Sequence, residues 1–368
     1  MRLFAATAVL PFTSAFVPVL SDHQDVLKPG KTGIAPAIGL HLTSSYAIAT
    51  LRHKNGTIET LARVKGNAQY VDQMAFWSDF SLRRNCESES QAILCTMEDA
   101  QRFANKAQGR AATVAVKRFA TLLSDVKNVV EAKLRQEVKY VYPVMPVLAV
   151  MEEDDLRDAL RYAGLVWSSP NGISPYYETT GAYAGMGHGL CASFHNISEC
   201  KKEESTMQLE HVLFLNFDNS SFSAVLHPMQ ALNRMRPNVY ITEPNLGWWS
   251  LAIDQSVRTE QLAQIESVIN DVVTPLRIIP SKIILLGDHA HRCEYHGLIK
   301  RALWRSLHFD ASSLLEANDG IDSALLAANG AAELAFRMEN AEIARAADFD
   351  GPSTREQQGL SEEEVLEL

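Results

Sequence analysis

The chain has 368 residues with a formal net charge of −10, and 46% of its residues are hydrophobic. This length and apolar content suit a globular protein with two compact parts and a sizeable core. The acidic balance gives no general attraction to nucleic acid or to anionic membranes, and no basic stripe interleaved with aromatic residues is present. We therefore expect no nucleic-acid partner.

The N-terminus is typical of a secretory signal. Arg2 precedes a short apolar run that leads into small residues, which is the order of regions in such signals. We predict a signal peptide over residues 1–18, with an apolar N-terminal strand as the alternative. The run is too short to span a bilayer and no other stretch could cross one, so we expect no stable insertion into a membrane.

Cysteine spacing predicts two local disulfides. Cys86 and Cys95 have the same separation as Cys191 and Cys200, and both pairs lie in polar sequence. In a secreted chain such pairs are most simply disulfides, which leaves Cys293 free.

Three N-glycosylation sequons begin at Asn55, Asn196 and Asn219. Together with the signal and the paired cysteines, they favour a glycoprotein of the secretory pathway, either in the endoplasmic reticulum lumen or secreted. A cytoplasmic location is the alternative.

After a polar linker at 17–33, the first half of the chain reads as three strands, a helix, an extended segment and a helix. Asn55-Gly56 between two apolar runs is a strong hairpin signal, because both turn positions take positive φ. Gly164 ends the last helix. In chain order we predict strands at 37–42, 45–52 and 57–64, a mixed stretch at 70–111 with a short helix near 97–107, a helix at about 112–135, an extended segment at 138–150 and a helix at 152–163.

The second half repeats this scheme as a pattern, although no repeat is visible in the sequence itself. Its end is acidic and contains Gly and Pro, which is typical of a disordered tail. We predict strands at about 209–216, 221–227 and 238–242, a helix at about 256–273, a strand at 282–286, helices near 293–304 and 321–346, and a disordered tail over 347–368.

Two other patterns carry little weight. Pro29-Gly30-Lys31-Thr32 looks like part of a P-loop, but Asp25 stands where that motif needs glycine and no strand precedes it. His and Cys residues gather at 188–200 and at 288–296 without a recognised zinc spacing. We therefore predict no metal site at either cluster.

Six segments, far apart in the chain, have an apolar strand or a helix start next to a turn of small residues. In this order they resemble the nucleotide-binding domain of the heat-shock-70 chaperones, within the actin-like ATPase superfamily, from about Ala35 to Arg337 with gaps. The segments are similar to the first phosphate loop at 37–46, the helix before the inter-lobe hinge at 155–165, the hinge helix at 178–183, the second phosphate loop at 212–222, the adenosine loop at 283–289 and the closing helix at 327–332.

The resemblance implies an α/β fold of the two-lobed actin-like ATPase type, in which a ribonuclease H-like unit is duplicated. Its upper subdomains would be reduced, because little chain lies between the strand at 221–227 and the helix at 256–273. Lobe I would cover residues 34–200. Lobe II with the closing helix would cover residues 205–346.

The resemblance also implies which residues would meet a nucleotide. Where the family has two carboxylates that organise magnesium, this chain has His41 and Asn216. Thr43 and residues 218–220 stand where the family has the glycines that admit phosphate. The candidate residues are Glu178 and Lys65 for catalysis, if the protein is active, and Ser44, Ser45, Tyr46, Asn219, Ser220, Ser221, Gly287 and Asp288 for cofactor binding.

These departures favour a degenerate nucleotide-binding or pseudo-ATPase module that acts by binding an unidentified protein partner. Asp218 beside a polyphosphate would cost on the order of 1 kcal/mol or more at close range, which weighs against cofactor binding. One alternative is a working chaperone-type ATPase with ATP or ADP and magnesium as cofactors. The other is a secreted structural or interaction protein that binds no nucleotide.

Overall fold

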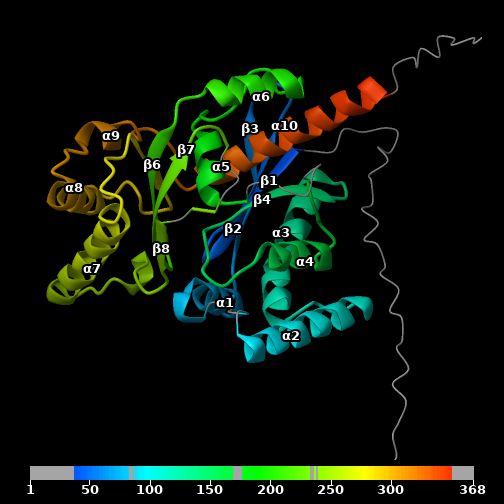
Figure 1. The fold of residues 1–368 in the computed structure, drawn as a ribbon, viewed down its shortest axis with the longest axis horizontal. Coiled ribbons are helices and arrows are strands. Elements are labelled where there is room, and N and C mark those ends of the chain that lie inside the picture. The colour runs from blue at the N-terminus through cyan, green and yellow to red at the C-terminus, as the bar shows by residue number, and fades with distance from the viewer. Residues whose placement is uncertain are drawn as a thin grey trace, which may run out of the picture. The chain divides into compact units, whose positions relative to one another are not determined.

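The computed structural model describes residues 37–82, 86, 88–168, 176–232, 236–237 and 239–349, with side chains as far as residue 340. The predicted signal peptide at 1–18, the linker at 17–33 with its P-loop-like residues, and the tail beyond residue 349 lie outside this part of the chain. The described residues form a mixed α/β structure with two sheets and ten α-helices (Figure 1).

The first sheet has the strand order β3-β2-β1-β4-β5. Its first three strands form an antiparallel meander, and β4 and β5 follow in parallel with β1. The predicted hairpin at Asn55-Gly56 joins β2 to β3, where Gly56 has a φ of 89° and His53 N–H donates to Thr57 O at 2.9 Å. The strands are β1 (Ala37–Leu42), β2 (Tyr46–Arg52), β3 (Ile58–Lys65), β4 (Tyr140–Val144) and β5 (Val166–Trp167).

The second sheet repeats this connectivity in the order β8-β7-β6-β9, with an antiparallel meander and then a parallel strand beside its first strand. All the predicted strands form. The extended segment at 138–150 contributes only β4, because beyond Val144 the chain leaves the sheet and Met145 bridges to Tyr177. The strands are β6 (Glu210–Phe217), β7 (Phe222–Met229), β8 (Val239–Glu243) and β9 (Lys282–Leu286).

The predicted helices form, two of them with corrected bounds, and three further helices, α1, α6 and α9, were not predicted. The helix predicted near 97–107 begins at Glu89, because Ser88 and Gln91 form a capping box there. The last helix begins at Leu326 and runs to Phe349, so that residues 347–349 of the predicted tail are helical. The helices are α1 (Ala68–Ser78), α2 (Glu89–Ala107), α3 (Val114–Leu134), α4 (Glu153–Tyr162), α5 (Glu178–Gly185), α6 (Ile197–Thr206), α7 (Gln255–Val273), α8 (Cys293–Leu307), α9 (Ser312–Glu316) and α10 (Leu326–Phe349), with 3-10 turns η1 (Phe80–Leu82) and η2 (Trp248–Ser250).

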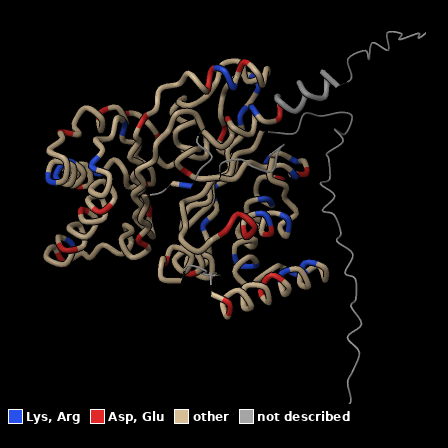
Figure 2. Tube along the Cα trace, viewed as in Figure 1, with Lys and Arg blue, Asp and Glu red and all other residues tan. Residues whose placement is uncertain are grey.

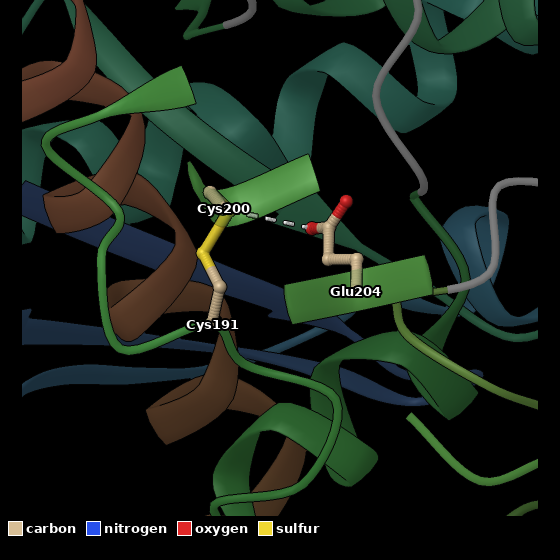
Figure 3. Close-up of side chains that lie close together, drawn as sticks. All are labelled: Cys191, Cys200 and Glu204. Carbon is tan, nitrogen blue, oxygen red and sulfur yellow. Dashed lines mark hydrogen bonds between the residues drawn. A yellow bond between two sulfur atoms is a disulfide. The ribbon is translucent and has the colours of Figure 1, made fainter. Parts of the chain in front are cut away.

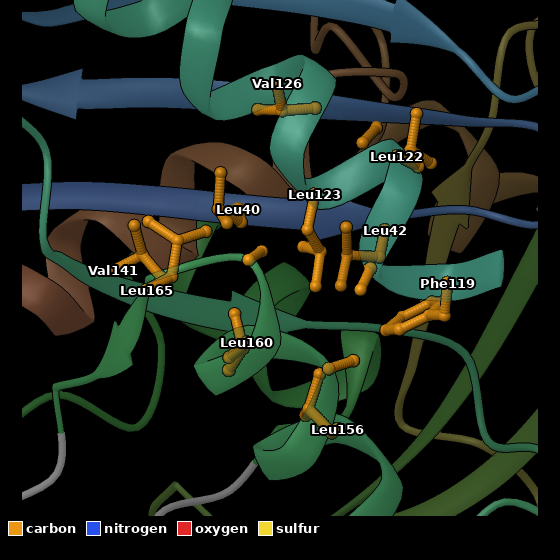
Figure 4. Packing of buried hydrophobic residues seen from close by; sticks show 14 of the residues in the cluster. Leu40, Leu42, Phe119, Leu122, Leu123, Val126, Val141, Leu156, Leu160 and Leu165 are labelled. Atoms are coloured by element: carbon orange, nitrogen blue, oxygen red, sulfur yellow. The ribbon is translucent and has the colours of Figure 1, made fainter. Parts of the chain in front are cut away.

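The first sheet has its own apolar core, which α3 and α4 complete. Thr113 caps α3 by accepting a backbone N–H of the first turn. Phe119 and Leu123 on the buried face of α3 lie in one cluster with Leu42 of β1 and Leu156 of α4 (Figure 4). Full burial of each such side chain stabilises the fold by about 1.5–3 kcal/mol. The second sheet has a separate core that α7 and α8 complete.

Two helices, α5 and α10, join the two sheets. Tyr142 of β4, Phe214 of β6 and Ala331 of α10 belong to a single buried cluster. The two helices approach each other at glycines, since a Cβ on Gly330 would lie 1.7 Å from the carbonyl oxygen of Gly181. Side chains from both sheets therefore meet next to a tightly packed helix pair.

Both predicted disulfides are present. The Cα atoms are 6.2 Å apart in the Cys86–Cys95 pair and 5.2 Å apart in the Cys191–Cys200 pair, and Cys293 is free and exposed. Two disulfides are compatible with an oxidising compartment such as the secretory pathway.

Candidate functional site

Two turns from different sheets meet at one point. Thr43–Ser45 lies between β1 and β2, and Asp218–Ser221 lies at the β6–β7 connection. Ser44 Oγ lies 2.5 Å from Ser221 Oγ and 3.0 Å from Ser220 Oγ. The two turns therefore face each other, and their side chains are in direct contact.

Two backbone N–H groups at the first turn already have a partner. Thr43 Oγ1 accepts the N–H of Ser45 at 3.2 Å and that of Tyr46 at 3.1 Å. Phosphate-binding turns present such N–H groups to their ligand. Thr43, which replaces a glycine of the resembled loop, thus takes the donors that a phosphate would use.

Below the two turns, three polar side chains form a buried network. Glu178 at the start of α5 has one carboxylate oxygen 3.2 Å from His41 Nε2, and the same oxygen accepts a hydrogen bond of 3.0 Å from Asn216 Nδ2. The three residues are 2%, 2% and 6% exposed. They come from α5, β1 and β6, so the network links both sheets to the helix between them.

Asp218 is a buried carboxyl at the junction of the two turns. Burial raises its pKa from 3.8 to about 6, and the negative charge of Asp288 acts in the same direction. Ser45 Oγ donates to its Oδ2 at 3.3 Å. Burial also raises the pKa of Tyr46, helped by the charge of Asp218. The junction is therefore a poor place for a further negative charge.

Asp288, at the resembled adenosine loop, is also engaged. Its Oδ2 accepts a hydrogen bond of 2.9 Å from Asn219 Nδ2 and pairs with the Arg63 guanidinium of β3. The preceding Gly287 has a φ of 90°, and a Cβ there would lie 2.4 Å from the Phe217 carbonyl oxygen. This turn therefore needs glycine for its own geometry, whether or not a nucleotide binds.

A cavity of about 320 Å³ opens beside this turn. Its volume is at the lower end of the range for small-molecule sites. Of the predicted cofactor-binding residues only Gly287 and Asp288 line it, whereas the five in the two opposed turns and Tyr46 of β2 do not. The lining residues are Arg63, Gly287, Asp288, His291, Asp322, Ser323, Ala324 and Leu325.

Lys65 was predicted as a candidate catalytic residue, whereas Arg63 was not predicted as a site residue. Arg63 lies two positions before Lys65, on the same face of β3. The Lys65 ammonium lies 4.7 Å from the centroid of the Trp249 ring, and the Arg63 guanidinium lies 4.1 Å from that of Tyr46. Both cations thus stack on aromatic rings. Arg63 lines the cavity and Lys65 does not.

Cys191, Cys200 and Glu204 form the one group of potential metal ligands among the described side chains (Figure 3). Both sulfurs are joined in the disulfide, and Glu204 Oε1 is 3.7 Å from Cys200 Sγ. Metals bind the thiolate form of cysteine, so the oxidised group offers a single carboxylate. The stretch 288–296 forms no such group in the described part of the chain.

Lysine and arginine are interspersed with acidic residues along the described trace (Figure 2). Among the helices of the described residues, none is both long enough and apolar enough to cross a bilayer. No model of a known protein family matches the chain, and no curated protein matches it significantly.

Proposed function

We propose that the protein is a divergent module of the two-lobed actin-like ATPase type, similar to the heat-shock-70 nucleotide-binding domain, that does not hydrolyse ATP. Two sheets with the same connectivity and two opposed turns at their inner ends support this fold assignment. Lobe I would contain the first sheet and lobe II the second sheet with α10, both with reduced upper subdomains.

The buried network around Glu178 is the observation that carries this proposal. ATP hydrolysis in such a fold needs carboxylates that position hydrated magnesium. At the three matching positions the chain retains one carboxylate, Glu178, and its oxygen is bound by His41 and Asn216. A magnesium ion at this oxygen would have to break both contacts and would leave two buried polar side chains without their shared acceptor, which is costly.

Existing hydrogen bonds also occupy the place between the two turns where a phosphate would bind. A phosphate between the two turns would have to separate Ser44 from Ser221 and displace the Thr43 hydroxyl from two backbone N–H groups. It would also approach Asp218. ATP therefore meets a site in which two backbone N–H groups are already bound and the nearby carboxylate of Asp218 repels it.

Without turnover, such a module acts through the proteins that it binds. We place this activity in the secretory pathway, because two disulfides close local loops and a signal-like segment begins the sequence. The partner is a protein rather than a nucleic acid, in keeping with the net charge of −10 and with basic and acidic residues that are interspersed along the trace (Figure 2).

Nucleotide binding and phosphate release of the purified chain test the proposal. With 1 mM MgATP as the probe, a dissociation constant above that concentration stabilises the fold by less than about 0.5 kcal/mol, which is a shift of about 1–2 °C in the unfolding midpoint. We expect no larger shift and no phosphate release above a heat-denatured control.

A variant with the two aspartates restored tests whether the missing metal ligands alone explain the lack of ATP hydrolysis, or whether the altered phosphate turns also prevent it. The double variant His41→Asp with Asn216→Asp should remain inactive, because Thr43 and the second turn still lack the glycines that admit phosphate. Magnesium-dependent turnover by the wild type that Ser44→Ala abolishes would show instead that the protein is a working ATPase.

A further inference from the structure

The helix α2 has an orientation that is unusual for a surface helix. A charged side chain on its inward side binds α4, since Arg102 donates to Asp155 at 2.5 Å and to Asp158 at 2.8 Å. Cys95 on the same side is buried and bonded to Cys86. Amphipathic helices normally turn their apolar face to the core. Here a disulfide and ion pairs hold the polar face inward instead.

The opposite face of α2 is apolar and exposed. Ile93, Met97, Ala100, Ala104 and Ala107 follow one another at alternating steps of four and three residues, which is the spacing of a coiled-coil seam. Ile93 is 57% and Met97 63% exposed. Exposed large side chains flank the seam at Leu94 and Phe103.

We propose that a second copy of this chain covers this face, with the two α2 helices antiparallel and Ala100 of each at the two-fold axis. In this register Ile93 lies opposite Ala107 of the other copy, and Met97 lies level with Phe103, one residue from Ala104. The end of the seam with large side chains meets the end with small ones only when the helices are antiparallel.

The helix dipoles favour the same orientation. An antiparallel pair of α2 helices opposes the two dipoles, whereas a parallel pair would align them.

The exposed apolar area sets the strength of the pairing. The four large side chains expose on the order of 500 Å² per copy, which matches the largest apolar patches of single proteins. Pairing would then bury about 1,000 Å² in total, the lower limit for a specific interface. We therefore expect a dimer that dissociates at micromolar concentrations.

Sedimentation of the full-length chain over about 1–100 µM measures this equilibrium. Met97→Glu should weaken dimerisation at least tenfold and leave the circular dichroism spectrum unchanged. Ile253→Glu is the matched control, because Ile253 is fully exposed and lies outside α2; it should have no effect. A wild type that stays monomeric, or a dimer that Met97→Glu does not weaken, would overturn the proposal.

Disulfide cross-linking tests the register independently. In a Cys293→Ser background, Ala100→Cys should form a covalent dimer with itself on mild oxidation. Ala107→Cys alone should stay monomeric, but should cross-link when mixed with Ile93→Cys. Self-cross-linking of Ala107→Cys without any by Ala100→Cys would contradict the antiparallel register. A monomer that captures another protein or a lipid vesicle through this face would also refute self-pairing.

Discussion

His41 Nε2 lies 3.2 Å from the Glu178 carboxylate, and both side chains are only 2% exposed. The same two residue types meet on the surface, where His53 Nε2 is 3.3 Å from Glu59 and the side chains are 41% and 45% exposed. The distances are nearly equal but the surroundings differ. A buried carboxylate depends on its partners for the hydrogen bonds that water supplies on the surface.

The two pairs give a matched test of burial. Glu178→Ala leaves His41 and Asn216 buried without their shared acceptor and should cost about 3–5 kcal/mol of unfolding free energy. Glu59→Ala should leave the urea midpoint within experimental error, because water replaces its exposed contacts with His53 and Lys133. Equal shifts of the urea midpoint for the two variants would mean that the buried network contributes no more to stability than the exposed pair.

Thiol counting checks the cysteine assignment. The unreduced chain should react with one equivalent of iodoacetamide when it is denatured without a reductant, since only Cys293 is free. After reduction all five cysteines should react. Cys293→Ser should abolish labelling of the unreduced chain. Three reactive thiols in the unreduced wild type would show that one of the two predicted disulfides is open.

Local patterns predicted the strands and the longer helices, but not the shorter helices α1, α6 and α9. Alternating or continuous apolar runs and the Asn55-Gly56 turn marked β2 and β3, and helical periodicity located α7 to within one residue at its start. The start of α2 was missed because its apolar face points to solvent. Ser88 and Gln91 at the spacing of a capping box were the local signal that could have located it.

The site was predictable in outline only. The resemblance identified the two turns and Glu178, but not what fills the space between them. His41 and Glu178 are separated by 137 positions, and Ser44 and Ser221 by 177. Such pairs leave no local signature in the sequence. The role of Thr43 was hidden for a different reason, since its hydroxyl binds its own turn only in one backbone conformation.

Gly330 in α10 is required by the close approach of α5. Gly330→Ala would force a Cβ to within 1.7 Å of the Gly181 carbonyl oxygen, so the helices must separate. We expect a loss of about 3 kcal/mol or more. Gly297, in α8, has its nearest neighbour 3.7 Å from an added Cβ. Gly297→Ala should therefore stabilise the fold by up to about 1 kcal/mol, as helix propensity predicts. Thermal unfolding of both variants measures the contrast, and similar midpoints would refute it.

The buried carboxyl of Asp218 should make stability depend on pH. Its pKa is raised from 3.8 to about 6 by burial, so the folded state favours the protonated form. A raised folded-state pKa contributes stability that is fully present below the unfolded value and is lost as pH rises through about 6. Two pKa units correspond to about 3 kcal/mol. The ionised form therefore destabilises the protein at neutral pH.

Asp218→Asn removes this charge while its amide oxygen can still accept from Ser45. The variant should be more stable than the wild type by about 2–3 kcal/mol at pH 7.5, and the difference should vanish by about pH 4. Asp310→Asn is a control of opposite sign, because hydrogen bonds from Ser312 lower the pKa of Asp310. The Asp310 carboxylate stabilises the fold above its unfolded pKa. The variant should therefore become less stable than the wild type as pH rises. Urea unfolding at several pH values gives both differences. A difference for Asp218→Asn that stays constant with pH would show that Asp218 titrates alike in the folded and unfolded chain.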